Sequence, residues 1–156
     1  MRRTDKEVKD PEQIFDILRR CDTMRVAFHG GDYPYVVPLS YGMEVAGGKP
    51  VLYFHCATTG LKLDLMEQDP KVCVEADRLI KIDRPRYGIT ARYESVIGFG
   101  ECSLVSDPEE VMHGLKLLLE HYGADDYPLD VCNGVFHLRV GKIVLDEITG
   151  KRSLPE

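Results

Sequence analysis

Short apolar segments separated by glycine-containing turns make up most of the first half of the chain. Thr23–Phe28 alternates apolar and polar residues, as a half-buried strand does, and His29-Gly30-Gly31-Asp32 supplies a turn. Tyr35–Met43 predicts a second strand, and Ala46-Gly47-Gly48-Lys49 leads into a third, Val51–His55. Strands joined by turns this short pair antiparallel, so this part of the chain is restricted to an antiparallel meander.

Later segments continue the strand pattern. Lys71–Ala76 and Arg92–Val105 predict two more strands, and glycines within the second indicate a bend, a bulge or a close approach of backbone. Val135–Val140 and Lys142–Ile148 predict two final strands joined tightly at Gly141. The charged, proline-containing stretch between these groups, Arg78–Thr90, is either an ordered crossover or a mobile flap over a site.

Three helices accompany the strands. Asp10-Pro11 and Asp107-Pro108 each combine an N-cap aspartate with proline at the first helical position. The apolar spacing that follows predicts helices to Cys21 and to Tyr122, and Leu61–Glu67 predicts a short third one. We therefore expect a mainly β, α+β fold: an antiparallel, closed or partly closed barrel with flanking helices, which leaves few strand edges exposed.

Size and charge exclude several classes of protein. The 156 residues fit one domain, 1–156. Lys and Arg total 20 against 26 Asp and Glu, and a net charge of −6 disfavours a nucleic-acid partner, which requires a clustered basic surface. No run approaches the roughly 20 apolar residues of a membrane span, and no signal-peptide core follows the charged start. We expect a soluble, cytoplasmic protein.

The cysteines and histidines do not predict a metal site. The five cysteines are odd in number, no two have C-x-x-C spacing, and Cys73 and Cys102 lie in apolar strands that favour core packing. His113 and His121 lie eight residues apart on one helix, about 12 Å along its axis. The adjacent His55-Cys56 pair points to opposite faces of a strand.

The segment before the short helix has the chemistry of an anion site. Thr58-Thr59-Gly60 precedes the helix and Lys62 lies in its first turn, where a cation opposes the helix dipole. A bound phosphate or carboxylate would relieve that conflict and accept hydrogen bonds from the free N–H groups. The alternative is that Thr58 or Thr59 is only an N-cap and that Lys62 is solvated.

The order of these motifs resembles a known family. Tyr33-Pro34-Tyr35-Val36-Val37-Pro38-Leu39-Ser40, Leu52–Ala57, Gly60-Leu61-Lys62 and Tyr93–Gly100 are similar, in sequence and spacing, to the flavin-binding pyridoxamine 5'-phosphate oxidase-like superfamily. The closest likeness is to its nitroimidazole-resistance (Nim-type) branch. The resemblance implies a split β-barrel, a homodimer, and FMN bound in the groove between subunits.

The resemblance also implies a set of FMN-binding residues. Backbone groups of one strand would line the flavin ring, a second segment would surround the phosphate and ribityl chain, and a long strand would meet the flavin, often from the partner subunit. In that order the three groups are Val37, Pro38, Leu39 and Ser40; His55, Cys56, Ala57, Thr58 and Lys62; and Ser95 and Val96.

One position departs from the family pattern. Members commonly have an arginine immediately before this lysine, and here the residue is Leu61. His55, the threonine hydroxyls and Arg92 are the candidates to replace its charge. The chain also ends Lys151–Glu156 without the arginine-rich tail of the oxidase proper, so the resemblance does not extend to vitamin B6 oxidation.

Two functions follow from the resemblance. The first is a Nim-like, FMN-dependent oxidoreductase acting on a small oxidised substrate such as a nitro compound, with His55 as the catalytic candidate that orients substrate or supplies a proton. The second is a non-catalytic flavin- or haem-binding protein for storage or sensing, because a fold does not fix a function. The alternative for His55 is a structural role, in which its side chain caps the end of the strand with a hydrogen bond to the backbone. Arg84-Pro85-Arg86-Tyr87 is either a solvated loop or a contact to a nucleotide or pocket.

Overall fold

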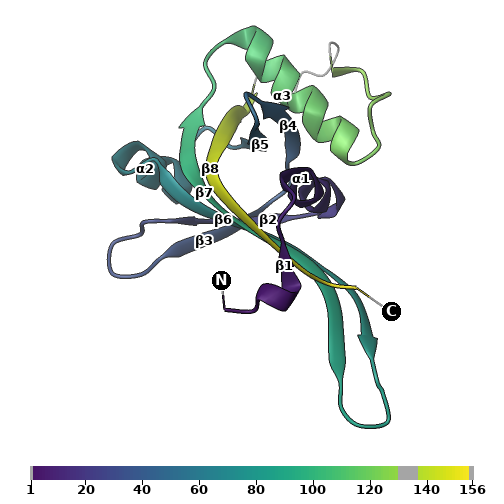
Figure 1. The fold of residues 1–156 in the computed structure, drawn as a ribbon. Helices are drawn as coiled ribbons and strands as arrows, with labels where there is room; N and C mark the ends of the chain where they lie inside the picture. Colours follow the sequence, from purple (N-terminus) through teal and green to yellow (C-terminus); the bar gives the residue numbers. More distant parts are fainter. Residues whose placement is uncertain (1, 130–136, 155–156) are drawn as a thin grey trace.

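The structure, a computed structural model, describes residues 2–129 and 137–154, and forms one eight-stranded antiparallel sheet with three helices (Figure 1). The helices are α1 (Pro11–Arg20), α2 (Leu61–Gln68) and α3 (Pro108–His121), with a 3-10 turn at Thr4–Lys6. The strands are β1 (Glu7–Val8), β2 (Met24–Phe28), β3 (Tyr35–Leu39), β4 (Gly42–Ala46), β5 (Lys49–Cys56), β6 (Lys71–Asp83), β7 (Thr90–Leu104) and β8 (Arg139–Ser153).

The order of strands across the sheet is β3-β2-β6-β7-β8-β5-β4, with β1 paired to β8. The hairpin β2–β3 therefore lies at one edge and the hairpin β4–β5 at the other, so a simple meander is wrong. Within the described ranges neither β3 nor β4 has a second neighbour, and the barrel is split between them. The predicted antiparallel α+β fold with flanking helices is confirmed.

The predicted single strand Tyr35–Met43 is two strands. The chain leaves β3 after Leu39 and starts β4 at Gly42. Tyr41, which lies between them, is fully buried, and its hydroxyl donates a 2.6 Å hydrogen bond to the carbonyl of Leu18 in α1. Gly42 contacts the backbone of α3 so closely that a Cβ would overlap it. Contacts with two helices thus break a segment that is continuous in its apolar pattern.

The last predicted pair of strands is one strand. The start of that segment, 130–136, lies outside the described residues, and β8 runs unbroken from Arg139 through Gly141 to Ser153. Gly141 is paired with Phe54 of β5, and a Cβ at 141 would overlap the Phe54 ring. The glycine therefore provides room for an aromatic ring and does not form a turn.

The stretch Arg78–Thr90 is neither a crossover nor a flap. β6 continues to Asp83 and pairs with β7 as far as Thr90, so the two strands form a hairpin that projects from the body of the sheet (Figure 1). The register shifts between Phe99 and Gly100, where β8 contains one extra residue, Asp146, and a Cβ on Gly100 would overlap the Val144 backbone. The predicted close approach of backbone is confirmed, and the bulged residue lies in the neighbouring strand.

The core fills the inside of the barrel beneath α1. Asp10 caps α1 by accepting a hydrogen bond from the N–H of Glu12, and Ile17 and Leu18 of that helix are fully buried. Cys102 is buried in this core as predicted, whereas Cys73 is only half-buried. Burial of this apolar surface is the main stabilising term for a sheet with open edges.

A polar network fastens α3 to the opposite side of the sheet. The Tyr53 hydroxyl lies 3.1 Å from an oxygen of Glu44 and 3.2 Å from an oxygen of Glu110. Lys142 donates to Glu110 at 2.6 Å, and the His113 ring lies 2.9 Å from Glu44. Every charged member of this group has a partner of opposite charge or a hydrogen bond. We therefore interpret the network as a contact that holds α3 on the sheet.

Candidate functional site

The N-terminus of α2 presents uncapped backbone donors. Gly60 is the N-cap residue, with φ of 144° that side-chain-bearing residues rarely adopt. No side chain caps the helix, so neither Thr58 nor Thr59 has the predicted alternative role of an N-cap. The N–H of Leu63 donates to the carbonyl of Gly60 at 2.9 Å, whereas those of Leu61 and Lys62 have no backbone acceptor among the described residues. These two N–H groups remain available to an anion.

Two cations lie beside this helix end. Burial raises the pKa of the Cys56 thiol, and the positive charges of Lys62 and Arg139 oppose that rise. Arg139 is the cross-strand partner of Cys56, so its side chain leaves the sheet on the same face. Among the described residues neither cation has a carboxylate within 4.0 Å.

Arg139 is a candidate that the sequence analysis missed. It is 83 residues from Cys56 in the chain, and only the pairing of β5 with β8 brings the two together. The sequence carries no usable signal for it, because Arg139 falls near the end of the predicted strand Val135–Val140. Its role depends on which strand lies beside it.

A hollow of about 650 Å³ adjoins these groups. Its lining includes Thr58, Thr59 and Arg139, and also two carboxylates of α2, Asp64 in the first turn and Glu67. A phosphate in this hollow is attracted by the arginine and repelled by the two carboxylates.

His55, the residue before the last of β5, points to the other face of the sheet from Cys56. Its neighbours in sequence, Phe54 and Cys56, are buried, whereas His55 is exposed and pairs with Val140. Its ring has no hydrogen bond or ion pair in the described part of the chain, so the alternative of a strand-end backbone bond has no support. An exposed imidazole beside the barrel split remains free to meet a ligand. Ala57 follows it and is also exposed.

β3 supplies an open strand edge. The side chains of Val37 and Leu39 pack against the core, and Pro38 points outward. Because β3 is the last strand on its side of the sheet, one set of its backbone groups faces away from β2. Pro38 has no N–H to donate, and the adjoining residues do. Ser40 follows directly, exposed, where the chain leaves the strand.

The remaining predicted residues lie far from this end. Ser95 pairs with Lys151 of β8 whereas Cys56 pairs with Arg139 of the same strand, twelve residues away. At about 3.3 Å per residue this is about 40 Å along the strand. The side chain of Val96 is buried in the core. The path along β8 therefore separates Ser95 and Val96 from the residues at the start of α2.

Arg92 is already engaged. Its guanidinium pairs with Asp83 across the hairpin and donates a 2.8 Å hydrogen bond to the carbonyl of Leu154. Lys81 and Arg92 together hold the pKa of Asp83 below its ordinary value. Because the Arg92 guanidinium already has these two partners, Arg92 is a weaker candidate than Arg139 for binding a phosphate.

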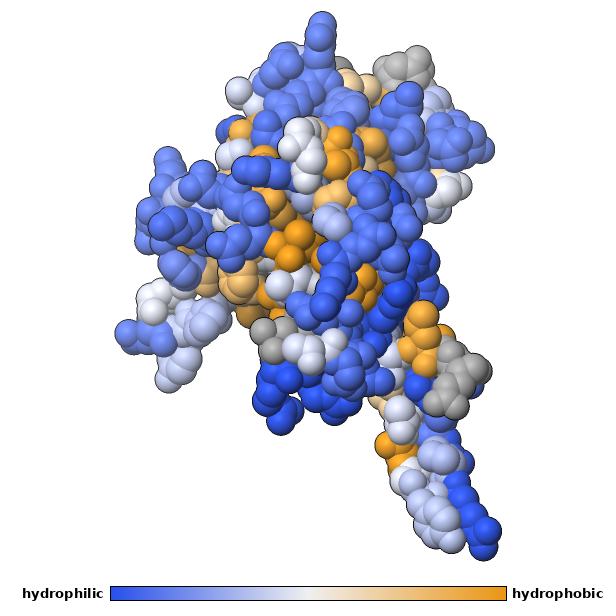
Figure 2. Space-filling model, viewed as in Figure 1, coloured by the Kyte–Doolittle hydropathy of each residue, from blue (hydrophilic) through white to orange (hydrophobic). Residues whose placement is uncertain are grey.

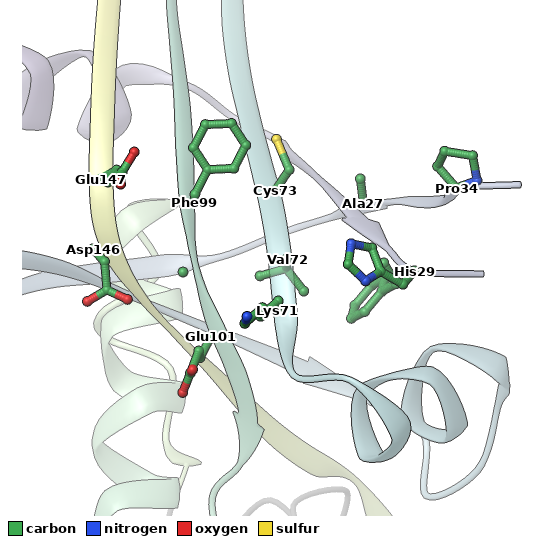
Figure 3. A pocket seen from close by; sticks show the side chains of 12 residues that line it. Ala27, His29, Pro34, Lys71, Val72, Cys73, Phe99, Glu101, Asp146 and Glu147 are labelled. Atoms are coloured by element: carbon green, nitrogen blue, oxygen red, sulfur yellow. The ribbon is translucent and has the colours of Figure 1, made fainter. Parts of the chain in front are cut away.

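A second hollow, of about 560 Å³, lies on the outer face of the sheet (Figure 3). Phe99 and Cys73 stand side by side on neighbouring strands, and carboxylates gather on the side of β7 and β8. His29, at the opposite end, lies 2.6 Å from Asp69. None of the predicted flavin residues lines this hollow. The carboxylates are Glu101, Asp146 and Glu147.

Residues 2–129 and 137–154 contain no cluster of three or more His, Cys, Asp or Glu side chains placed to hold a metal ion. None of the helices in those ranges is long and apolar enough to span a bilayer.

Comparison with known proteins identifies the family. Residues 10–152 match the family model described as pyridoxamine 5'-phosphate oxidase. The chain belongs to the pyridoxamine 5'-phosphate oxidase family. The predicted membership of this superfamily is thereby confirmed. No match was found among curated protein sequences.

Solved structures share the fold of this family member. A protein of Bacteroides thetaiotaomicron provisionally described as a 5-nitroimidazole antibiotic resistance protein is 27% identical, with a TM-score of 0.80 over 93% of this chain and 85% of that one. This similarity supports the predicted Nim-like branch. The flavocytochrome Anf3 of Azotobacter vinelandii is 18% identical, with a TM-score of 0.79 over 99% and 72% of the two chains.

A third structure, the FAD and haem binding protein of Mycobacterium smegmatis, is also 18% identical, with a TM-score of 0.77 over 97% and 76% of the two chains. At this identity the last two similarities establish the split-barrel fold alone.

Proposed function

We propose that this protein is an FMN-binding oxidoreductase of the Nim-like type that reduces a small oxidised compound. The observation that carries the proposal is the uncapped α2 N-terminus with Lys62 in its first turn and Arg139 lining the adjoining hollow, and β3 adds a free strand edge. A flavin mononucleotide has an anionic end and a flat ring with hydrogen-bonding edges. The two parts of this site match those two parts of the cofactor.

At the phosphate end, Lys62 and Arg139 supply charge, and the first-turn N–H groups and the Thr58 hydroxyl supply hydrogen bonds. At the ring end, backbone groups of Val37, Leu39 and Ser40 bind the polar edge of the flavin. The bound cofactor supplies the electron-transfer chemistry, and the protein supplies orientation and charge. His55 is exposed beside this region and is the group placed to orient a substrate or give it a proton.

We further propose that the site is completed by a second copy of the chain. The β8 partners of Ser95 and Cys56 lie twelve residues apart, a path of about 40 Å along the strand, and we propose that Ser95 and Val96 act on the flavin of the other subunit in a homodimer. A two-fold dimer contains two such sites, each built from both subunits. Such a dimer would also account for the fact that the FMN-binding residues implied by the family resemblance come from both ends of the long strands.

A second function is supported by the fold comparisons. The Azotobacter protein is a flavocytochrome and the Mycobacterium protein binds FAD and haem. These descriptions favour, as the alternative, a flavin- or haem-binding protein that stores or senses its cofactor without turnover.

The absorption spectrum of the purified protein, with mass identification of what denaturation releases, tests the cofactor. FMN bands support the proposal, FAD or a Soret band supports the alternative, and a colourless protein that takes up no added FMN contradicts both. Catalysis is tested by reducing the flavin with dithionite without oxygen and adding a nitroaromatic compound. Faster reoxidation in the protein than in its His55→Gln variant, at equal FMN content, supports turnover. No acceleration by any acceptor other than oxygen favours storage or sensing.

A further inference from the structure

The β6–β7 hairpin forms an arm, defined here as residues 78–92, that projects from the body of the sheet (Figure 1). It holds five of the 20 Lys and Arg residues and one of the 26 Asp and Glu residues, so the arm carries +4 and the rest of the chain carries −10. In Figure 2 strongly hydrophilic residues lie along one side of this projection and at its end. A positive arm on an acidic protein attracts anions from solution.

The register of the hairpin places two like charges opposite each other. Lys81 pairs directly with Arg92, and Asp83 pairs with Thr90, so these four side chains lie on one face of the arm. Two cations directly across a strand pair repel each other and destabilise the ribbon. Asp83 offsets part of this repulsion, because one of its oxygens lies 2.8 Å from the Lys81 ammonium and the other accepts a hydrogen bond from Arg92.

A hollow of about 360 Å³ lies at the end of the arm and is lined by these four residues together with Arg84 and Pro85. Both oxygens of Asp83 are engaged, whereas Arg84 has no carboxylate within 4.0 Å in the described part of the chain. Three cations and one carboxylate give the lining a net charge of +2. A phosphate monoester, with a charge of about −1.5 to −2, would neutralise it.

The two arginines of the hollow have different parts in it. Arg92 is held by Asp83 and by the carbonyl of Leu154, and its side chain is only 18% exposed, so it contributes charge from a fixed position. The guanidinium of Arg84 has no such partners and can give a phosphate two parallel hydrogen bonds. The Thr90 hydroxyl lies on the same face and can donate one more. The direct ligand in this hollow is therefore Arg84.

The loop that closes the hollow also carries an exposed aromatic ring. Tyr87 is 85% exposed, and the Arg86 guanidinium lies 5.5 Å from the centre of its ring. Ile89, two residues further on, is 74% exposed. An exposed aromatic face is a surface on which a nucleobase stacks. One short loop thus combines a surface for a base with a cationic hollow for a phosphate.

We propose that the end of the arm binds a nucleotide, with Lys81, Arg84 and Arg92 around its phosphate and Tyr87 against its base. This ligand is additional to the flavin, because no residue lines both this hollow and the one at the start of α2. The competing occupant is an inorganic anion such as phosphate, which the cations attract without any role for Tyr87.

Equilibrium dialysis of radiolabelled ADP against the purified protein, with whatever flavin it carries, tests the site. Binding should be saturable, with one ADP per chain, and adenosine, which has no phosphate, should compete at least about tenfold more weakly. Pyrophosphate, which has no base, should compete at least about fivefold more weakly than ADP. The proposal is overturned by a protein that retains no ADP at millimolar concentration in low salt. Pyrophosphate that competes as well as ADP overturns it in favour of an inorganic anion.

Three variants assign the contacts. Arg84→Gln should weaken binding of ADP and of pyrophosphate at least about tenfold, since it removes a charge-assisted pair of hydrogen bonds. Tyr87→Ala should weaken ADP binding at least about fivefold and leave pyrophosphate binding unchanged. Arg19→Gln makes the same change of net charge on α1 and should alter ADP binding less than about twofold. Wild-type affinity for ADP in Arg84→Gln would contradict the assignment, and far-UV circular dichroism verifies folding.

FMN titration of the same samples separates this site from the proposed flavin site. ADP binding should be the same in the wild type, in Lys62→Ala and in protein saturated with FMN. ADP that FMN displaces in proportion would overturn the separate nucleotide site. A protein that binds ADP through Arg84 but takes up no FMN overturns the proposed function alone.

Discussion

Arg139 and Cys56 are cross-strand partners at the end of the barrel where α2 begins. The pairing places a guanidinium in the hollow beside the N-terminal end of α2, where we propose that the phosphate binds. Leu61, at the position where relatives commonly have an arginine, is 53% exposed and contributes no charge. Arg139 thus supplies, from β8, a positive charge in the region where Leu61 of α2 supplies none.

Arg139→Gln should weaken FMN binding about tenfold, the scale of one charge-assisted hydrogen bond, and leave riboflavin binding unchanged because riboflavin has no phosphate. Quenching of the fluorescence of each flavin on binding measures the two dissociation constants. Arg152→Gln, at the other end of β8, is the matched control. Equal losses for FMN and riboflavin would show that Arg139 does not act on the phosphate.

Lys62→Ala should weaken FMN binding by about 1–2 kcal/mol. Leu61→Arg should tighten it by a similar amount, since the position is exposed and lies in the first turn, where a bound phosphate offers a partner. The same titrations measure both variants. An unchanged affinity in Lys62→Ala contradicts the assignment of this helix end to the phosphate.

Mixed dimers test whether two chains build one site. Lys62→Ala damages the phosphate end, and Ser95→Trp blocks the contribution from the long strand. If the site is shared, each homodimer has two damaged sites, and a heterodimer of the two variants has one intact site and one doubly damaged site. About a quarter of all sites in a statistical mixture should regain wild-type affinity. No recovery after subunit exchange contradicts the shared site.

Tyr41→Phe should change how stability depends on pH. Burial, followed by the nearby Cys21, Tyr122 and Asp22 groups, raises the pKa of the Tyr41 hydroxyl well above its ordinary value. The folded state therefore holds the proton more tightly than the unfolded state. The resulting stability is fully present below about pH 10 and is lost as pH rises from there towards the raised pKa.

Urea unfolding at several pH values measures this effect. Above about pH 10 the wild type should lose up to about 1.4 kcal/mol more per pH unit than Tyr41→Phe does. Burial also raises the pKa of Cys21 to about 12, so both proteins keep a shared decline that starts near pH 9. At neutral pH the variant should lose about 0.5–1.5 kcal/mol with the hydrogen bond to Leu18. Parallel pH profiles would contradict the assignment.

Gly141→Ala should destabilise the fold by about 1–3 kcal/mol, because the added methyl overlaps the Phe54 ring. Phe54→Leu in the same chain should recover part of that loss by vacating the space. A double-mutant cycle from urea unfolding measures the coupling. Additive effects of the two substitutions would mean that the ring and the glycine are independent.

The sequence by itself determined the local elements. The N-cap aspartates at 10 and 107 fix the starts of α1 and α3, and both accept the hydrogen bonds that their positions predict. Alternating apolar residues fix β2 and the apolar face of β6. The antiparallel α+β class and the family could likewise be predicted from the sequence, because both predictions depend on the spacing of residues along the chain.

Tertiary structure decided what depends on neighbours from distant parts of the chain. The break at Ser40-Tyr41 follows from burial of Tyr41 between α1 and α3, and the continuity of β8 follows from Phe54 packing on Gly141. The place of Arg139 beside Cys56 follows from the pairing of β5 with β8. An apolar or charged residue has the same local pattern whichever strand it meets, and only long-range pairing selects that strand.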